Sequence, residues 1–329
     1  MELILNTFGA YIYQQDRMFK VKTEEKQALL SPEKIERILV TNAVTFSSDA
    51  VLLALESNID IIFFDKYGDP RGRVWHSRPG STITVKRRQL ELSQDEDGVR
   101  LALRWVIQKL NNQKDFLTEL ANNRKGEKKE FILKKRDFIK SKIPVVENIK
   151  GDIEEVRGQI MGNEGVCGRN YFAALSHIMP SQYAFSGRSH RPAGDYFNAF
   201  LNYGYGVLYS IVERAILIAG MDPFIGFIHA DNYNKKSLVF DLIEPYRIIA
   251  DKTVTYLFTG KQVKKECCRE MTKGFSLDKP GKELLIKSLN SRLDEVVHYK
   301  GKNHKVRDTI QLDFHEIAQN LLKKCQMPF

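Results

Sequence analysis

Cysteine pairs of the kind that bind zinc or build disulfide frameworks are missing from this chain. Only four cysteines occur, none in a C-x-x-C spacing, and Cys267 and Cys268 are sequence neighbours, which rarely bridge each other. The pattern therefore indicates neither a zinc module nor a disulfide-stabilised secreted domain. We expect a reducing, cytoplasmic setting.

Long apolar segments are missing as well. The most apolar helical stretch, GVLYSIVERAILIAG at 206–220, carries Glu213 and Arg214 at its middle. It falls short of the about 20 residues that a membrane-spanning helix needs. The opening segment MELILNTFGAYIY has neither the basic start nor the long apolar core of a secretion signal. We therefore expect no membrane segment.

Basic residues, by contrast, are plentiful. The 329 residues include 51 lysines and arginines against 41 aspartates and glutamates, which gives a net charge of +10. This balance favours polyanionic partners such as nucleic acid or acidic lipid, and by itself it does not distinguish between them. The length suits two domains, each with its own core.

The residue pattern divides the chain into a β-rich first part and a helical remainder. Over 1–76, short β-branched and aromatic segments alternate with turn residues, and one helix is expected from Ser48. Pro, Gly, Ser and basic residues at 77–88 predict a linker. Amphipathic helical periodicity follows over 89–329. We therefore predict an α+β fold, with a small N-terminal β-rich domain and a larger all-α C-terminal domain.

Glu164 is an acid within a predicted apolar stripe. Between 153 and 178, apolar residues recur at steps of three and four, and Glu164 lies on their face. A carboxylate there has to pair with a cation, accept hydrogen bonds or take a raised pKa, because desolvating its charge is costly. An ion pair with an arginine, or a helix break at the glycines around it, would satisfy this requirement without any functional role.

The stretch GFIHADNYNKKSLVFDLIEPYR, at 226–247, concentrates polar groups between apolar residues. His229 ends an apolar run, and a helix is expected from Ser237. Asp241 and Glu244 are three residues apart and therefore neighbours on one helical face. Two such acids repel each other unless a cation lies near, and Arg247 meets that need in a plain salt-bridge cluster. Glu164, His229 and Glu244 together favour a divalent metal instead, Mg²⁺ or Mn²⁺.

A third polar cluster precedes a predicted helix in GRSHRPAGDYFNAFLNYGYGVL, at 187–208. Asp195 has the position of an N-cap, and Asn198 follows at the third helical position. Arg188, His190 and Arg191 lie ahead of them. This cluster either binds phosphate or closes a loop, and the pattern leaves both interpretations open.

Four motifs, NEGVCGRNYF, RPAGDYFNAFLNYGYGVL, GFIHA and SLVFDLIEPYR, in this order and at these separations, closely resemble the CRISPR-associated integrase of spacer acquisition ("Cas one"). The resemblance implies an N-terminal dimerisation domain, a C-terminal catalytic domain, and a homodimer that joins a small partner ("Cas two") in a heterohexamer. Its metal ligands would be Glu164, His229 and Glu244, and Asp241 would also be needed for full activity. One departure, Ala193-Gly194 where relatives carry a second proline after R-P, affects a loop and no ligand.

The implied activity is that of a metal-dependent DNA endonuclease and integrase in antiviral defence. It would insert short foreign DNA fragments into a CRISPR array by 3′-hydroxyl transesterification, or hydrolyse DNA where water attacks. The candidate DNA contacts, each of which has an ion-pair alternative, are Arg169, Arg188, Arg191, Arg247 and Lys252. Tyr171 and Asn198 are expected to support the site. A general metal-dependent nuclease and a non-catalytic DNA-binding scaffold are the alternatives, and the intact ligand set argues against the scaffold.

Overall fold

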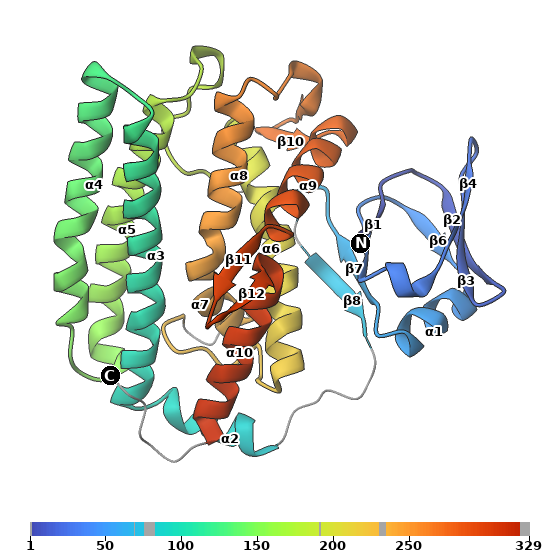
Figure 1. The fold of residues 1–329 in the computed structure, drawn as a ribbon, viewed down its shortest axis with the longest axis horizontal. Helices are drawn as coiled ribbons and strands as arrows, with labels where there is room; N and C mark the ends of the chain where they lie inside the picture. Colours follow the sequence, from blue (N-terminus) through green and yellow to red (C-terminus); the bar gives the residue numbers. More distant parts are fainter. Residues whose placement is uncertain (1, 69, 76–82, 191, 230–234, 323–329) are drawn as a thin grey trace.

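The computed structural model describes residues 2–68, 70–75, 83–190, 192–229 and 235–322 (Figure 1). Its strand-rich N-terminal part and mainly helical remainder confirm the predicted α+β fold. None of the described helices is long and apolar enough to cross a membrane.

The N-terminal part contains two four-stranded sheets and one helix. One sheet has the order β1 (Glu2–Leu5), β5 (Arg37–Val40), β7 (Asp60–Phe64) and β8 (Pro70–Val74), and the other has β4 (Gln27–Leu30), β3 (Met18–Lys22), β2 (Ala10–Gln15) and β6 (Val44–Phe46). Helix α1 (Ser48–Glu56) follows β6, and the Ser47 side chain caps it by accepting from the Ala50 amide. The buried side chains of both sheets and α1 form one hydrophobic core.

The helical part is built from helices α2 to α10, and three of the longest begin at an aspartate that caps the first turn. In chain order, the helices are α2 (Ile83–Leu92), α3 (Glu96–Asn122), α4 (Gly126–Glu147), α5 (Ile153–His177), α6 (Tyr196–Ala219), α7 (Ser237–Ile243), α8 (Arg247–Thr259), α9 (Lys279–Leu293) and α10 (Val306–Leu322). Asp95, Asp152 and Asp195 each cap a helix by accepting a backbone N–H three residues on. The predicted N-cap role of Asp195 is thus confirmed.

The smaller elements lie between these strands and helices. They comprise the 3₁₀ turns Pro32–Lys34, Ser181–Tyr183, Glu244–Tyr246 and Lys265–Cys267, and the antiparallel pairs β9 (Cys268–Glu270) with β10 (Phe275–Leu277) and β11 (Val296–Tyr299) with β12 (Lys302–Lys305). The prediction of an all-α C-terminal part was therefore wrong in this detail, because two short strand pairs lie between its last helices. Figure 1 shows α3, α4 and α5 side by side on one flank, α6 to α10 in the middle, and the β-rich part on the other flank.

The predicted linker differs from the structure at its C-terminal end. Residues 77–82 lie outside the described residues, whereas 83–88 belong to helix α2. Val85 and Gln89, one turn apart, are buried, and the Gln89 Nε2 donates to the carbonyl oxygens of Asp222 and Ile225 at 2.8 Å. The basic residues between them conceal this buried face, which is why the segment resembles a linker in sequence.

Polar side chains join the β-rich part to α6. Arg73 of β8 lies 3.4 Å from the Asp60 carboxylate and 3.5 Å from that of Glu213 on α6. Phe64 stacks on Tyr203 of α6 with 6.4 Å between ring centroids. Gly68 has φ +90°, and a Cβ there would lie 2.4 Å from a ring atom of Tyr203, so the close approach requires glycine.

Candidate catalytic site

Lys109 lies between the two predicted metal-ligand carboxylates that the structure brings together. Its Nζ forms an ion pair with Oε1 of Glu164 on α5 and lies 2.5 Å from Oε2 of Glu244. The side chains of Lys109, Glu164 and Glu244 are only 14%, 19% and 5% exposed. The cation that Glu164 required is therefore a lysine of α3, where the sequence interpretation had considered an arginine.

Two neighbouring cations keep the carboxyl group of Glu244 ionised. Arg247 donates through Nε to Oε1 of Glu244 at 2.9 Å. Burial raises the pKa of Glu244, but Arg247 and then Lys109 outweigh burial and hold the pKa at about 2. Oε2 of Glu244 is buried and makes no hydrogen bond among the described residues, although it lies in ion-pair range of Lys109. This oxygen retains its capacity to bind a cation.

Asp241 organises the loop that carries His229. Its Oδ2 accepts from the amides of Phe227 and Ile228 at 2.6 and 3.2 Å, and its Oδ1 from the His229 amide at 3.1 Å. The Nδ1 of His229 lies 2.6 Å from the same Oδ1. Since Asp241 takes Nδ1, only Nε2 of His229 remains to bind a ligand. Asp241 is therefore placed as a positioning residue.

The three predicted ligands are not assembled as one set. Within the described ranges, no group of three or more His, Cys, Asp or Glu side chains is placed to hold a metal. Glu164 and Glu244 already enclose a cation, and His229 lies on a separate loop. The donor chemistry fits Mg²⁺ or Mn²⁺, because two carboxylates and an imidazole with Nδ1 already engaged are suitable ligands.

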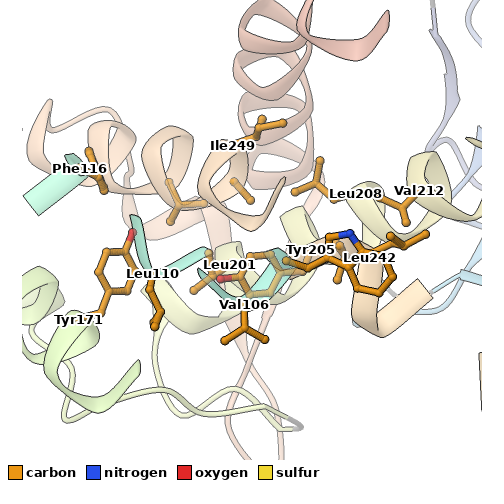
Figure 2. Close-up of a cluster of buried hydrophobic side chains, with 14 of the residues drawn as sticks. Val106, Leu110, Phe116, Tyr171, Leu201, Tyr205, Leu208, Val212, Leu242 and Ile249 are labelled. Carbon is orange, nitrogen blue, oxygen red and sulfur yellow. The ribbon is translucent and has the colours of Figure 1, made fainter. Parts of the chain in front are cut away.

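A buried acid that the sequence interpretation missed lies beneath Arg247. Asp251 of α8 accepts from Tyr171 Oη at 3.0 Å and from Tyr205 Oη at 2.6 Å. Figure 2 shows both tyrosines among the aliphatic side chains of the core. Burial raises the pKa of Asp251 to about 6, although the two tyrosine hydrogen bonds oppose the increase. Arg247 covers the Tyr205 ring at 4.6 Å from its centroid.

Lys109 and Asp251, which the sequence interpretation missed, each have a position in the sequence that could have revealed them. Lys109 lies four residues after Trp105 and four before Gln113, on the buried stripe of α3. Asp251 lies on the buried face of α8, three residues before Val254. A charged residue on such a stripe marks a paired or perturbed group.

Asn198 positions Arg188. The Asn198 Nδ2 donates to the carbonyl oxygen of Gly187 at 2.9 Å, and its Oδ1 accepts from Arg188 Nη1 at 2.9 Å and from the Ser189 amide at 3.0 Å. Arg188 also stacks over Tyr205, 5.3 Å from the ring centroid. Arg188 and Arg247 therefore both contact the Tyr205 ring.

A basic cavity of about 830 Å³ opens beside these two arginines. His190, Tyr205, Tyr209 and His229 contribute to its wall, and its lining cations are Arg71, Arg188, Lys235, Lys236 and Arg247. Burial, followed by Arg188 and Arg247, lowers the pKa of His190, so this imidazole is neutral at pH 7. The cavity has the positive lining and the volume to admit part of a phosphate backbone.

The other predicted DNA contacts either do not line this cavity or lie outside the described residues. Lys252 forms a 2.5 Å ion pair with Glu119 of α3, and it does not line the cavity. Arg169 is exposed on α5, five residues after Glu164. Arg191 lies outside the described residues. The structure thus brings Arg188 and Arg247 together and leaves Arg169 and Lys252 apart from them.

Comparisons with known proteins establish the family. The family model described as CRISPR associated protein Cas1 matches residues 3–291. The chain belongs to the Cas1 family. The CRISPR-associated endonuclease Cas1 1 of Archaeoglobus fulgidus is 33% identical to it over 331 residues, which cover 97% of this chain and 95% of that protein. The predicted family membership is therefore confirmed.

Solved structures share the Cas1 fold of this chain. One, described as "Casposase bound to integration product", is similar with a TM-score of 0.84 at 24% identity, over 99% of this chain and 92% of that chain. Another, described as "Cas6-RT-Cas1--Cas2 complex", has a TM-score of 0.81 at 22% identity, over 98% of this chain and 35% of that chain. Both structures are similar to this chain over its β-rich part and its helical part.

Proposed function

We propose that this Cas1 protein is a divalent-metal-dependent DNA endonuclease and integrase. The observation that carries the proposal is the pair of carboxylates, Glu164 and Glu244, that encloses one cation beside a basic cavity. Arg247 links the two features, since it binds Glu244 and also lines the cavity. Family membership supports the same activity, because a relative of 33% identity is named an endonuclease.

In this proposal Glu164, Glu244 and, once brought to these two carboxylates, His229 would hold Mg²⁺ or Mn²⁺. When bound, the ion would supply Lewis-acid chemistry, which would polarise a phosphate oxygen and stabilise charge on the leaving oxygen. Asp241 keeps the His229 ring oriented and its Nδ1 engaged, which leaves Nε2 for the ion. The pKa of about 2 keeps Glu244 ionised at every physiological pH, so no proton competes for it.

Arg188 and Arg247 hold the DNA phosphates in this scheme. Asn198 fixes one guanidinium, and Glu244 with Tyr209 fixes the other, so little side-chain entropy is lost when phosphate binds. The 3′-hydroxyl of an incoming fragment attacks a repeat phosphodiester and loses its proton as the new P–O bond forms. The P–O bond to the cut strand breaks, and its 3′-oxygen takes up one proton and leaves as a 3′-hydroxyl. Water in place of that hydroxyl gives endonuclease cleavage at the same site.

The proposed assembly is a homodimer that joins the small protein Cas2 in a heterohexamer, with the β-rich part as the dimerisation domain. A Cas1 fold within a complex described as containing Cas2 supports this partner. DNA is the other partner, in agreement with the net charge of +10.

The test supplies a labelled short duplex, a supercoiled plasmid with a repeat array, Cas2 and Mg²⁺ or Mn²⁺. Glu164→Ala, His229→Ala and Glu244→Ala are compared with wild type, and Glu127→Ala on the exposed start of α4 serves as the matched control. Joining by wild type and the control, and none by the three variants, supports the proposal. A wild type that cleaves without joining under all conditions would make the protein a general nuclease instead.

A further inference from the structure

The backbone of helix α3 at Lys109 is held in place by its neighbours. One turn further along α3, Asn112 donates through Nδ2 to the carbonyl oxygen of Pro245 at 2.7 Å. This bond holds α3 against the turn that carries Glu244. Trp105, one turn before Lys109, is buried in the core, so the helix has little freedom to withdraw. The ammonium group is therefore directed at the carboxylates by the fold itself.

The charges of the four side chains joined by ion pairs at Lys109 balance without any added ion. Two carboxylates, Glu164 and Glu244, face two cations, Lys109 and Arg247, so the sum is −2 + 2 = 0. A divalent ion added to this set leaves an excess of two positive charges in a largely buried place, where like charges repel strongly. The ammonium nitrogen also lies 2.5 Å from Oε2 of Glu244, and a divalent ion bound to that oxygen at about 2.0–2.1 Å, the distance typical of Mg²⁺, would overlap with it. Both cations cannot occupy that position.

We propose that Lys109 is an internal substitute cation, which occupies the metal position in the metal-free protein and is displaced when the divalent ion binds. This inference rests on the proposed metal-dependent function. Lys109 keeps the carboxylates of Glu164 and Glu244 close together before the metal arrives, and its removal from between them is part of the cost of metal binding. Its flexible four-carbon stem allows the ammonium to turn away while the helix stays in place.

Lys109→Met tests this competition, because methionine retains most of the side-chain length and removes the charge. Lys114→Met, on the same helix but paired with Asp115 away from the site, is the control. The dissociation constant for Mn²⁺ is measured on the protein alone by calorimetry and by electron paramagnetic resonance of free Mn²⁺. We expect Lys109→Met to bind Mn²⁺ about tenfold more tightly than wild type, or tighter still, with Lys114→Met unchanged.

A second readout is thermal stability. Without metal, Lys109→Met should melt at a lower temperature than wild type, because the Glu164 carboxylate then loses its ion pair and Glu244 keeps only the one with Arg247. Mn²⁺ should raise the melting temperature of Lys109→Met by more than that of wild type. Equal or weaker Mn²⁺ binding by the folded variant overturns the inference and leaves the proposed function intact. Absence of Mn²⁺ binding in both proteins overturns the proposed function and the inference with it.

Wild-type protein provides a test that does not depend on the folding of a variant. Reductive methylation followed by mass spectrometry measures the reactivity of each lysine with and without Mg²⁺. The side chain of Lys109 is 14% exposed in the described arrangement, so it should react slowly in the metal-free protein and faster when Mg²⁺ displaces it. Unchanged reactivity of Lys109 at saturating Mg²⁺ overturns the inference.

Discussion

The Nδ1 of His229 lies 2.6 Å from Oδ1 of Asp241, and the same carboxylate accepts the backbone amides of residues 227–229. One buried acid thus fixes both the loop and the ring orientation of a predicted metal ligand. The two acids of the 241–244 pair therefore have separate tasks: Glu244 faces the cation and Asp241 positions the histidine.

Asp241→Asn should reduce integration by about 10- to 100-fold, the range typical of groups that orient a metal ligand. An amide retains one acceptor but cannot accept from all three backbone amides and the imidazole at once. The measurement is single-turnover joining, with the Mn²⁺ dissociation constant determined in parallel. Full joining activity in the folded variant would contradict the positioning role.

Asp251→Asn should stabilise the protein at pH 8 and have little effect at pH 4. The folded-state pKa of Asp251, about 6, lies above its ordinary value of 3.8, so the folded state prefers the protonated acid. Stability is therefore lost as pH rises from the ordinary value through about 6, by up to about 3 kcal/mol. Urea unfolding of wild type and variant at both pH values measures the difference. An Asp251→Asn variant that is less stable than wild type by the same amount at pH 4 and at pH 8 would contradict the predicted direction of the effect.

Much of the arrangement could be predicted from local patterns. The α+β organisation follows from the change between short β-branched segments and amphipathic periodicity, and the Asp195 cap follows from its place before a helix. The partners of Glu164 and Asp241 could not be predicted in this way, because they depend on tertiary packing. Lys109 lies 55 residues before Glu164, and nothing in the sequence specifies that α3 and α5 are adjacent.

Arg73→Met should destabilise the protein by about 3–5 kcal/mol, the usual cost of removing one partner of a buried ion pair. Asp60 is fully buried, neither of its carboxylate oxygens has a hydrogen bond among the described residues, and Arg73 is its close cation. Burial raises the pKa of Asp60, and Arg73 opposes that increase. The double variant Asp60→Asn with Arg73→Met should recover part of the loss in urea unfolding. A double variant less stable than Arg73→Met would contradict the pairing.

Gly68→Ala should destabilise the contact between the β-rich part and α6 by about 1–3 kcal/mol, through its positive φ and the clash with Tyr203. Gly72→Ala is the matched control, since a Cβ there meets nothing within 4 Å. Thermal melts of the two variants provide the comparison. Equal melting temperatures would show that the close approach to Tyr203 is not required.

Anomalous diffraction from crystals soaked in Mn²⁺ tests the central claim most directly. The account predicts one strong peak within about 2.0–2.3 Å of carboxylate oxygens of Glu164 and Glu244 and of Nε2 of His229, with the Lys109 ammonium moved away. A crystal that binds Mn²⁺ elsewhere, with Lys109 still between the two carboxylates, would contradict it.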